Sequence, residues 1–438
     1  MDRRTYLDPT FARVKESRLD SKEAGIGKRV RSYRGAVMER RTFLKAITGL
    51  SALAIQPWKN VEAFEAADES GAAVLGRQVG VFLSGVSRGA PEQVLKVAVR
   101  AVAESTTDFS WLSKGDSVFI KPAHNSGSPY PATTSPIAVR AMVELLREKG
   151  AGRVIVGDMS GIEHVKLSPK GLTGSSRRLM ESSGMAQAVQ AAGGELYFFE
   201  EAGWNAFYEE APAVGSHWKH GLMMPNILKN VEHIVLMPRC GRHPLAGDSL
   251  GLKTAVGYWR TDTRLEYHRD ASTFQEKTAE GNTVETLMKK QRLVLSAADK
   301  ILTTFGPDKG YVLQPENGLI IGSESVVAHD MVLLAWLLKN RRDVPSSEKD
   351  WFNDPYESQF IVNSANKYFV VRKLGGWGPA FDSEKLTRND INTIWADRVL
   401  NRAYQVFGGT PKVILQRADN AVPDDLRKQI NAMVTRSS

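Results

Sequence analysis

The sequence predicts an α/β protein, with a mostly parallel sheet and helices on both faces, followed by a small C-terminal α+β appendage. Short runs that are apolar throughout, at residues 118–120, 154–156 and 234–237, alternate with longer segments whose apolar residues recur at helical spacing. A strand with apolar side chains on both sides must be buried on both faces. This burial is typical of a parallel sheet between two layers of helices.

The elements expected in the first half of the chain follow this alternation. They are strands at 78–83, 117–120, 153–156 and 196–199 and helices at 91–102, 136–149 and 179–192. The clearest boundary is the start of the second helix, where Ser135 is an N-cap residue and Pro136 takes the first helical position.

The second half of the chain continues the pattern and then loses it. The expected elements are a strand at 231–237, a helix at 284–298, strands at 301–305 and 319–321, and a helix at 326–338. After Arg341 the pattern weakens, and we expect strands at 368–371 and 413–415 and a helix at 391–406. We therefore divide the chain into a leader with its linker (1–70), an α/β domain (71–340) and a C-terminal appendage (341–438).

The positive charge of the chain is concentrated near its N-terminus. The whole sequence has a formal charge of +9, but residues 1–63 contain 14 Lys/Arg against 7 Asp/Glu, which leaves +2 for the remainder. A nucleic-acid-binding domain keeps a strong positive field, so this remainder argues against nucleic acid as a partner.

Residues 39–58 resemble a twin-arginine export signal. The pair Arg40-Arg41 precedes a modestly apolar run over 46–56, and small residues suited to cleavage stand at 61–63. The run is far shorter than the roughly 20 residues of a membrane helix, so no stable membrane span is expected. We expect the twin-arginine translocase as a partner during export and a periplasmic or extracellular location. The alternative is an amphipathic N-terminal helix.

Cys240 is the only cysteine of the chain. One thiol excludes an intramolecular disulfide and a cysteine-ligated iron–sulfur cluster held by this chain alone. A lone cysteine is most often a small buried hydrophobic residue. However, Arg239 and Arg242 on either side would lower the pKa of the thiol, which leaves a reactive role open.

Ionisable residues follow three of the expected strands. After the strand at 117–120 come Lys121, His124 and Asn125; after that at 153–156 come Asp158 and His164; and after that at 231–237 come Arg239, Arg242 and His243. In open parallel sheets, ligands bind beyond the carboxyl ends of the strands. These side chains should meet there if the strands are neighbours, together with the helix start at Ser135, whose free N–H groups favour an anion.

The segment 231–270 is the richest in such side chains. Four glycines separate its cations and histidines, which include Lys253, Arg264 and His268. A structural surface rarely needs so many cations directly after a core strand. The segment therefore indicates a site for a small anionic substrate or cofactor.

We assign roles by residue type. Histidine and lysine exchange protons near neutral pH when their pKa values are tuned, so the candidate catalytic residues are His124, His243, Lys253 and Lys121. The candidate substrate-binding residues are Asn125, Ser135, Asp158, Arg239, Arg242, Arg264 and His268. If a metal is bound, the candidate ligands are His124, Asp158, His164 and His243. Local capping of turns and helices is the alternative role for His124, Asn125 and Asp158.

Four segments together resemble the domain-of-unknown-function 362 family: residues 118–125, 133–161, 243–257 with His268, and 318–330. They follow the family's order of a strand ending in Lys-Pro, a Thr-x-Pro helix start, a strand ending in Gly-Asp, and later histidine and lysine segments. The chain departs from the family pattern at Ala123, where Asn is frequent, at Arg242-His243, which replace Lys-x-His, and at Thr254. The resemblance implies the α/β domain but no particular reaction.

A weaker likeness is to lactate racemase-type proteins, in which a Thr-x-Pro helix start precedes a strand that ends near a histidine. It implies a metal or a preloaded cofactor, and an isomerase- or racemase-like or metal-assisted enzyme. Some members of the domain-of-unknown-function 362 family carry ferredoxin-type segments. Because this chain has only one cysteine, their electron-transfer role does not carry over to it. Two other functions stay open: a non-catalytic periplasmic binding module, and a partner of an exported redox complex.

Overall fold

The computed structural model describes residues 75–436, except 214, 305, 349–359 and 390. The expected leader, with its export signal at 39–58, lies outside the described residues. No helix among the described residues is long and apolar enough to cross a membrane.

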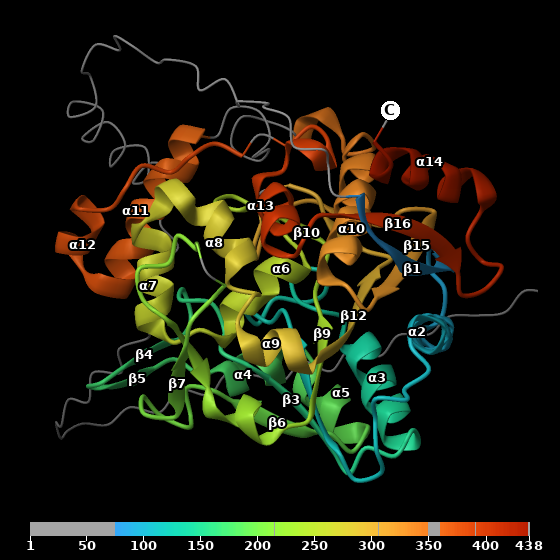
Figure 1. Cartoon of the computed structure of the whole chain (residues 1–438), viewed down its shortest axis with the longest axis horizontal. Helices are drawn as coiled ribbons and strands as arrows, with labels where there is room; N and C mark the ends of the chain where they lie inside the picture. The colour runs from blue at the N-terminus through green and yellow to red at the C-terminus, as the bar shows by residue number, and fades with distance from the viewer. Residues whose placement is uncertain (1–74, 214, 305, 349–359, 390, 437–438) are drawn as a thin grey trace, which may run out of the picture. The chain divides into compact units, whose positions relative to one another are not determined.

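An eight-stranded mixed sheet forms the centre of the fold (Figure 1). Its strands, in spatial order, are β16 (Thr410–Arg417), β1 (Leu75–Ser87), β15 (Asn317–Ser323), β12 (Gln291–Ala298), β9 (His233–Met237), β2 (Ser117–Pro122), β3 (Arg153–Asp158) and β6 (Glu195–Phe198). Within this sheet β15 pairs antiparallel with both of its neighbours, and the other pairings are parallel. The predicted fold class is confirmed.

Three smaller sheets flank the central one. They are β11 (Gly247–Ser249) with β10 (Gly241–His243), β13 (Ile301–Leu302) and β14 (Val312–Leu313); β4 (Lys166–Ser168) with β5 (Gly171–Thr173); and β7 (Phe207–Glu210) with β8 (Leu222–Pro225). The first is formed by the chain directly after β9 and β12, so it lies beyond the carboxyl edge of the central sheet.

The helices follow the predicted alternation in most of the chain. They are α2 (Glu92–Thr106), α3 (Pro136–Glu148), α4 (Ser176–Ser182), α5 (Met185–Ala191), α6 (Gly251–Thr254), α7 (Thr261–Arg269), α8 (Phe274–Glu280), α9 (Glu285–Lys290), α10 (Val326–Arg341), α11 (Phe360–Gly375), α12 (Trp377–Phe381), α13 (Arg398–Val406) and α14 (Asp424–Val434). The expected start of α3 is confirmed, because the Ser135 hydroxyl accepts a hydrogen bond from the Ala138 N–H at 3.3 Å.

Side chains of the parallel strands alternate between the two faces of the sheet. In β2, Val118 and Ile120 pack with α2, α3 and α5, whereas Phe119 packs on the opposite side with residues of α7 and α8. Each face is thus covered by helices, and this explains why the strands are apolar throughout.

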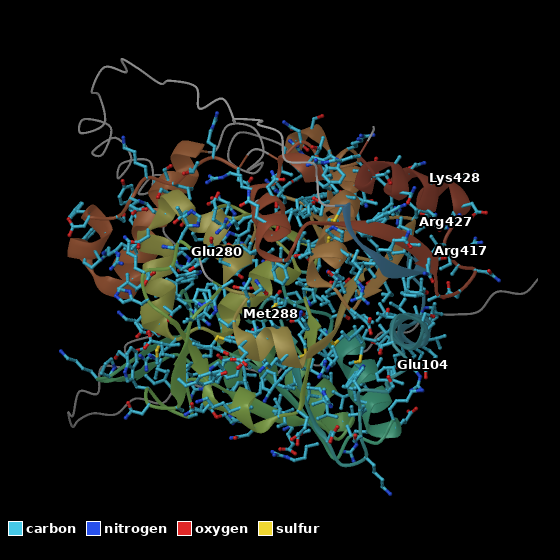
Figure 2. The ribbon with its side chains drawn as sticks, viewed as in Figure 1. Glu104, Glu280, Met288, Arg417, Arg427 and Lys428 are labelled. Atoms are coloured by element: carbon cyan, nitrogen blue, oxygen red, sulfur yellow. The ribbon has the colours of Figure 1, made fainter. Side chains whose placement is uncertain are left out.

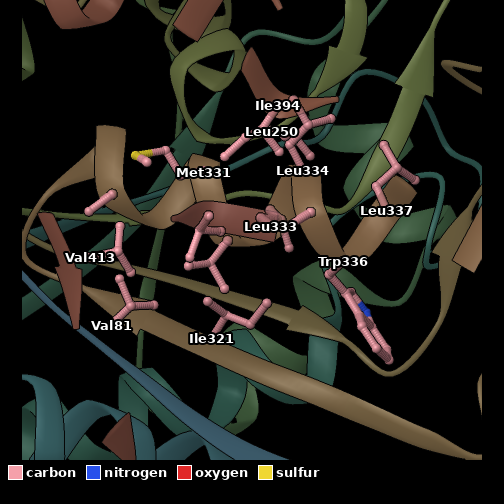
Figure 3. Packing of buried hydrophobic residues seen from close by; sticks show 14 of the residues in the cluster. Val81, Leu250, Ile321, Met331, Leu333, Leu334, Trp336, Leu337, Ile394 and Val413 are labelled. Carbon is pink, nitrogen blue, oxygen red and sulfur yellow. The ribbon is translucent and has the colours of Figure 1, made fainter. Parts of the chain in front are cut away.

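Helix α10 forms the centre of a second part of the core (Figure 3). Its Met331, Leu334 and Trp336 belong to one buried cluster with Val81 of β1 and Val413 of β16. Because α10 also contacts α6, α13 and α14, it is apolar on nearly all sides, as expected of a helix without a solvent-facing side.

The helix predicted at 284–298 is wrong. The chain forms the short helix α9 and then turns directly into strand β12, which pairs with β9 on one side and β15 on the other. Leu293, Val294 and Leu295 are all fully buried. An apolar run buried on both faces of a sheet has no period that separates it from a buried helix, so the sequence pattern misassigned it.

Other elements also differ from prediction, and among them the helix expected at 391–406 begins only at Arg398. The helix expected at 179–192 is divided into α4 and α5, because Gly184 adopts a left-handed backbone (φ 80°) between them. The strand expected at 368–371 lies inside helix α11, where Val371 is fully buried and Val370 nearly so.

The C-terminal region joins the central sheet instead of forming a sheet of its own, since β16 pairs with β1 along the edge. Glu280 of α8 (labelled in Figure 2) accepts hydrogen bonds from Arg402 of α13 and from His217, and its carboxylate is fully buried. The boundary predicted at residue 341 stays a prediction, but the residues after it are integral to the described fold.

Candidate functional site

A cavity of about 340 Å³ lies at the carboxyl ends of β2, β3 and β9. These three strands are adjacent and parallel, with Lys121 opposite Leu236 and Pro122 opposite Met237 in the register. The loops that follow them therefore converge, as the sequence predicted. The segment 243–268, which runs from the β10–β11 hairpin through α6 to α7, forms much of the remaining wall.

The cavity brings together most of the predicted site residues. Its lining includes Lys121, His124, Asn125, Asp158, His164, Arg239, His243, Lys253, Arg264 and His268. Ser135 and Arg242 are not part of the lining. The Ser135 hydroxyl caps α3. Arg242 lies opposite Asp248 in the β10–β11 pair; burial raises the pKa of Asp248 and Asp397, and the charge of Arg242 partly offsets this.

Lys121 and Asp158 form a buried ion pair between neighbouring strands. The Lys121 ammonium lies 2.9 Å from the Asp158 carboxylate and donates to the Pro122 carbonyl at 2.8 Å. The other Asp158 oxygen accepts the His124 backbone N–H at 2.8 Å. Burial lowers the pKa of Lys121 and raises that of Asp158, whereas their attraction favours both charged forms. The pair compensates its own charge.

Gly257 permits this pair to sit against the turn after α6. A Cβ atom at this position would overlap both the Lys121 ammonium and the Asp158 carboxylate. The next residue, Tyr258, places its ring 5.2 Å from the Lys121 nitrogen. The glycine is therefore required by close approach of a charged pair, not by a turn.

The two arginines of the lining donate most of their hydrogen bonds to backbone carbonyls. Arg264 donates to the carbonyls of Ser160 and Met159 at 2.7 Å each, and to those of Gly257 and Val256 at 3.0 and 3.1 Å. Its guanidinium thus joins the loop after β3 to the turn after α6. Burial lowers its pKa to about 10, so it still contributes positive charge at neutral pH.

Arg239 retains one donor group. Its Nε donates to Ser249 at 3.1 Å, and its Nη1 donates to the carbonyls of Ala132 and Pro307. Within the described residues its Nη2 makes no hydrogen bond. Burial lowers the pKa of Arg239 to about 10, so this group remains a cationic donor beside the cavity.

His243 is held in one tautomer by the backbone. Its Nδ1 accepts hydrogen bonds from the N–H groups of Leu245 and Ala246, at 3.2 and 3.3 Å. Burial, followed by the charges of Lys253 and Arg239, lowers the pKa of His243 well below its ordinary value. The ring is therefore neutral and carries its proton on Nε2, which makes it a hydrogen-bond donor.

His268 is held in the opposite tautomer. Its Nδ1 lies 2.7 Å from the carbonyl of Arg264, which can only accept, so Nδ1 carries the proton. Burial lowers the pKa of His268 to about 3, which keeps the ring neutral. Its Nε2 consequently has a free lone pair and is a proton acceptor.

His124 is almost fully buried beside the Lys121–Asp158 pair. Its Nε2 lies 2.7 Å from the Ser183 hydroxyl, and its Nδ1 has no hydrogen-bond partner among the described residues. Burial lowers the pKa of His124 to about 4. An unpartnered nitrogen in the lining of a cavity is a place where a ligand's polar group would be stabilised.

Lys253 differs from the two arginines of the lining because its charged group is bound by no other side chain or carbonyl among the described residues. Within this part of the chain its ammonium makes no hydrogen bond and no ion pair, and in particular none with Asp248. Burial, and then the charges of Arg239 and Arg264, lower the pKa of Lys253 to about 7, although Asp248 opposes this shift. The amine is therefore partly neutral at physiological pH, which is unusual for lysine.

Helix α6, which carries Lys253, is hydrogen-bonded at its N-terminus to a side chain of α10. The Asp330 carboxylate accepts the backbone N–H groups of Gly251 and Leu252 at 2.8 and 2.7 Å and also contacts the His329 ring at 2.9 Å. A Cβ at position 251 would overlap Asp330. Asp330 thus caps a helix far from it in the chain, whereas its own helix is capped by Ser325.

Sequence reasoning missed several residues of the site. Asp308, in the loop after β13, accepts a hydrogen bond from Asn125 and lies 3.4 Å from His164, whose pKa it raises. Asn366 and Val370 of α11 also line the cavity, although they belong to the expected appendage. No local pattern signals either contribution, because each arises only when distant segments meet.

The predicted metal ligands do not form one centre. Among the described residues, no group of three or more His, Cys, Asp or Glu side chains is arranged to hold a metal ion. Cys240 is fully buried, and burial raises the pKa of its thiol well above its ordinary value. The effect of burial on the thiol pKa is therefore larger than that of the neighbouring arginines. Of the two expected roles, a buried hydrophobic residue or a reactive thiol, the structure supports the first.

Residues 118–335 match the family described as a domain of unknown function (DUF362), which supports the resemblance read from the motifs. No curated protein matches the chain. Two solved structures are similar to it: a protein from Thermotoga maritima (14% identity, TM-score 0.36, covering 57% of this chain and 58% of that chain) and the lactate racemase apoprotein from Thermoanaerobacterium thermosaccharolyticum (13%, TM-score 0.33, 52% and 51%). The chain thus covers little more than half the length of each.

Proposed function

We propose that the cavity binds a small anionic molecule and transfers protons to and from it, in an isomerase- or racemase-like reaction. Lys253 carries this proposal, because it is a cation in the cavity lining without a counter-ion among the described residues. A cation without a carboxylate partner is costly in a desolvated site. A bound anion would supply the missing charge, as carboxylates and phosphates do for lysine and arginine.

The charge balance of the lining supports an anionic ligand. Lys121 is neutralised by Asp158, and His164 by Asp308. Arg239 and Lys253 remain beside the cavity with little compensation. Since Arg239 keeps Nη2 and His243 keeps its Nε2–H, the ligand would meet both cations and neutral donors.

The protonation states of the lining support proton transfer. Lys253 has a pKa of about 7, so it can hold or release a proton at neutral pH, whereas His268 stays neutral and offers a lone pair on Nε2 through which a proton can be relayed. Efficient acid–base catalysis requires groups whose pKa lies near the working pH. Lys253 meets this condition and is the candidate acid and base, and the neutral ring of His268 is the candidate proton relay.

Binding is tested with a series of small carboxylates and phosphates in a thermal-shift assay, followed by titration calorimetry of those that raise the Tm. Lys253→Met should weaken binding about 10- to 100-fold, the loss of one charge-assisted contact. Lys289→Met, which removes an exposed lysine of α9, is the control and should bind like the wild type. Equal affinity of both variants would refute the proposed site.

Proton transfer is tested on any anion that binds. In deuterated buffer, the wild type should exchange a carbon-bound proton of the ligand for deuterium, observed by NMR. His268→Gln and Lys253→Met should slow this exchange about 100-fold or more, as expected for loss of a general base. Tight binding with no exchange would identify a non-catalytic binding module instead.

We also propose that the protein is exported folded by the twin-arginine route and acts in the periplasm or outside the cell. The basis is the Arg40-Arg41 pair and the apolar run after it. Replacing both arginines by lysine in the full chain should retain the protein in the cytoplasm, as measured by cell fractionation. Unchanged export of this variant would contradict the route.

A further inference from the structure

The amine of Lys253 has an environment unlike that of Lys121, which lines the same cavity and is paired with Asp158. It projects from α6, a single helical turn whose N-terminal amides are bound by the Asp330 carboxylate. The turn packs against α10 and the buried cluster around it. The backbone that carries Lys253 is thus held against a buried core helix, so the amine approaches a bound molecule from one defined wall of the cavity.

The groups that face Lys253 disfavour its charge. They are Arg239 and Arg264, which are cationic, His243 and His268, which are neutral, and Asp248. Burial and two neighbouring carboxyl groups raise the pKa of Asp248 well above its ordinary value, so it is a weak counter-ion. Lysines are activated as nucleophiles in this way, by desolvation together with nearby cations.

The same surroundings restrict the partner of this amine. A neutral aldehyde or ketone would leave Arg239 uncompensated, whereas a carboxylate beside the carbonyl group would pair with it. The Nε2–H of His243 is a neutral donor suited to a carbonyl oxygen. A molecule with a carbonyl carbon next to a carboxylate satisfies all three groups, and this describes a 2-oxo acid.

We propose, as a step that rests on the proposed function, that Lys253 forms an imine with the carbonyl carbon of a small 2-oxo acid bound in this cavity. The neutral amine attacks the carbonyl carbon, a C–N bond forms, and one proton released by the nitrogen passes to the carbonyl oxygen. The resulting carbinolamine then loses its oxygen as water, which takes the second proton of the nitrogen, and a C=N bond remains, so one amine and one carbonyl give one imine and one water.

His268 provides the proton relay that these steps need. Attack turns the amine nitrogen into an ammonium, which must lose a proton before water can leave. The lone pair on His268 Nε2 is available because its Nδ1–H is bound to the Arg264 carbonyl. The imine would in turn draw electrons from the carbon next to it and make a proton there easier to remove, which links this step to the proton transfer proposed above.

The test is reductive trapping. Full-length protein is incubated with pyruvate, 2-oxobutyrate or 2-oxoglutarate and sodium cyanoborohydride, and the modified lysine is identified by peptide mass spectrometry. At pH 7 the neutral fraction of Lys253 exceeds that of an ordinary lysine by a factor on the order of 10²–10³. We therefore expect adduct at Lys253 at least about 10-fold above that at any surface lysine with at least one of the three acids.

Two variants sharpen the test. Lys253→Arg retains the charge and should still bind the oxo acid but form no adduct, whereas Lys289→Met should be labelled like the wild type. Adduct spread evenly over surface lysines, or no adduct at Lys253 with any of the three acids, would overturn the imine.

Calorimetry separates failure of the imine from failure of the proposed function. DL-lactate has a carboxylate but no carbonyl group, so it reports anion binding alone. Binding of lactate or of an oxo acid without an adduct at Lys253 would refute the imine and leave the anion site standing. Absence of binding for lactate, the oxo acids and the wider anion series would refute both.

Discussion

On the β2–β3 side of the cavity Lys121 lies 2.9 Å from Asp158, whereas on the α6 side Lys253 has no carboxylate within ion-pairing distance among the described residues. Both lysines are desolvated, and burial lowers the pKa of each. The charge of Lys121 is balanced by Asp158 within the fold, whereas the charge of Lys253 is left for a bound ligand to balance. A buried charge that is paired stabilises a site, and one left unpaired is available for a ligand.

The largest effect on stability is expected from removing one partner of the Lys121–Asp158 ion pair, on the β2–β3 side of the cavity. Asp158→Asn leaves the Lys121 ammonium buried with the Pro122 carbonyl as its remaining polar partner. It should lower the free energy of unfolding by about 3–5 kcal/mol, measured by urea denaturation at pH 7. In the matched control, Glu195→Gln removes an exposed ion pair with Arg153 and should cost less than about 1 kcal/mol. Equal losses would show that the buried pair is not special.

The next effect tests how closely the pair is packed. Gly257→Ala introduces a Cβ that overlaps Lys121 and Asp158, and we expect a loss of about 1–3 kcal/mol in the free energy of unfolding. Gly378→Ala, in helix α12, meets no atom within 4 Å and is the control. It should be neutral or stabilising by up to about 1 kcal/mol, because alanine favours helix. A neutral Gly257→Ala would contradict the close approach.

The third prediction concerns the pH dependence of stability that arises from His268, on the same side of the cavity as Lys253. The pKa of His268 is about 3 in the folded state, below its unfolded value of about 6.5, so the unfolded state binds more protons as the pH falls through 6.5. Stability is therefore lost on acidification. Between pH 7 and pH 5 the wild type should lose about 1–2 kcal/mol more than His268→Gln, which can keep the hydrogen bond to the Arg264 carbonyl. Parallel stability curves for the two proteins would refute this assignment.

The smallest effect, of opposite sign, is expected at Lys253. Lys253→Met removes a cation beside Arg239 and Arg264 and breaks no hydrogen bond or ion pair formed by the described residues. Its free energy of unfolding should be unchanged or higher by up to about 1 kcal/mol, although binding and proton transfer are lost. A loss comparable to that of Asp158→Asn would mean that Lys253 has a structural partner after all, and the comparison between the two sides would fail.

Much of the site could be predicted because its chemistry follows strand ends. Lys121, Asp158 and Arg239 each stand directly after a short apolar run, and parallel strands place such residues at one edge. The predictions went astray where the local pattern is ambiguous. Strand β12 looked like a helix, and the strand expected at 368–371 lies in α11, because continuously buried apolar runs do not reveal their period.

The sequence by itself determined the fold class, the start of α3 at Ser135 and the set of ionisable residues at the strand ends, since burial patterns and capping are local properties. Only the tertiary structure decided which of these charges are balanced. Arg264 donates hydrogen bonds to four backbone carbonyls, and Lys121 forms an ion pair with Asp158. Lys253 has no carboxylate partner among the described residues. The reason is physical: pKa values and charge balance depend on distances through space between segments far apart in the chain, and these distances exist only after folding.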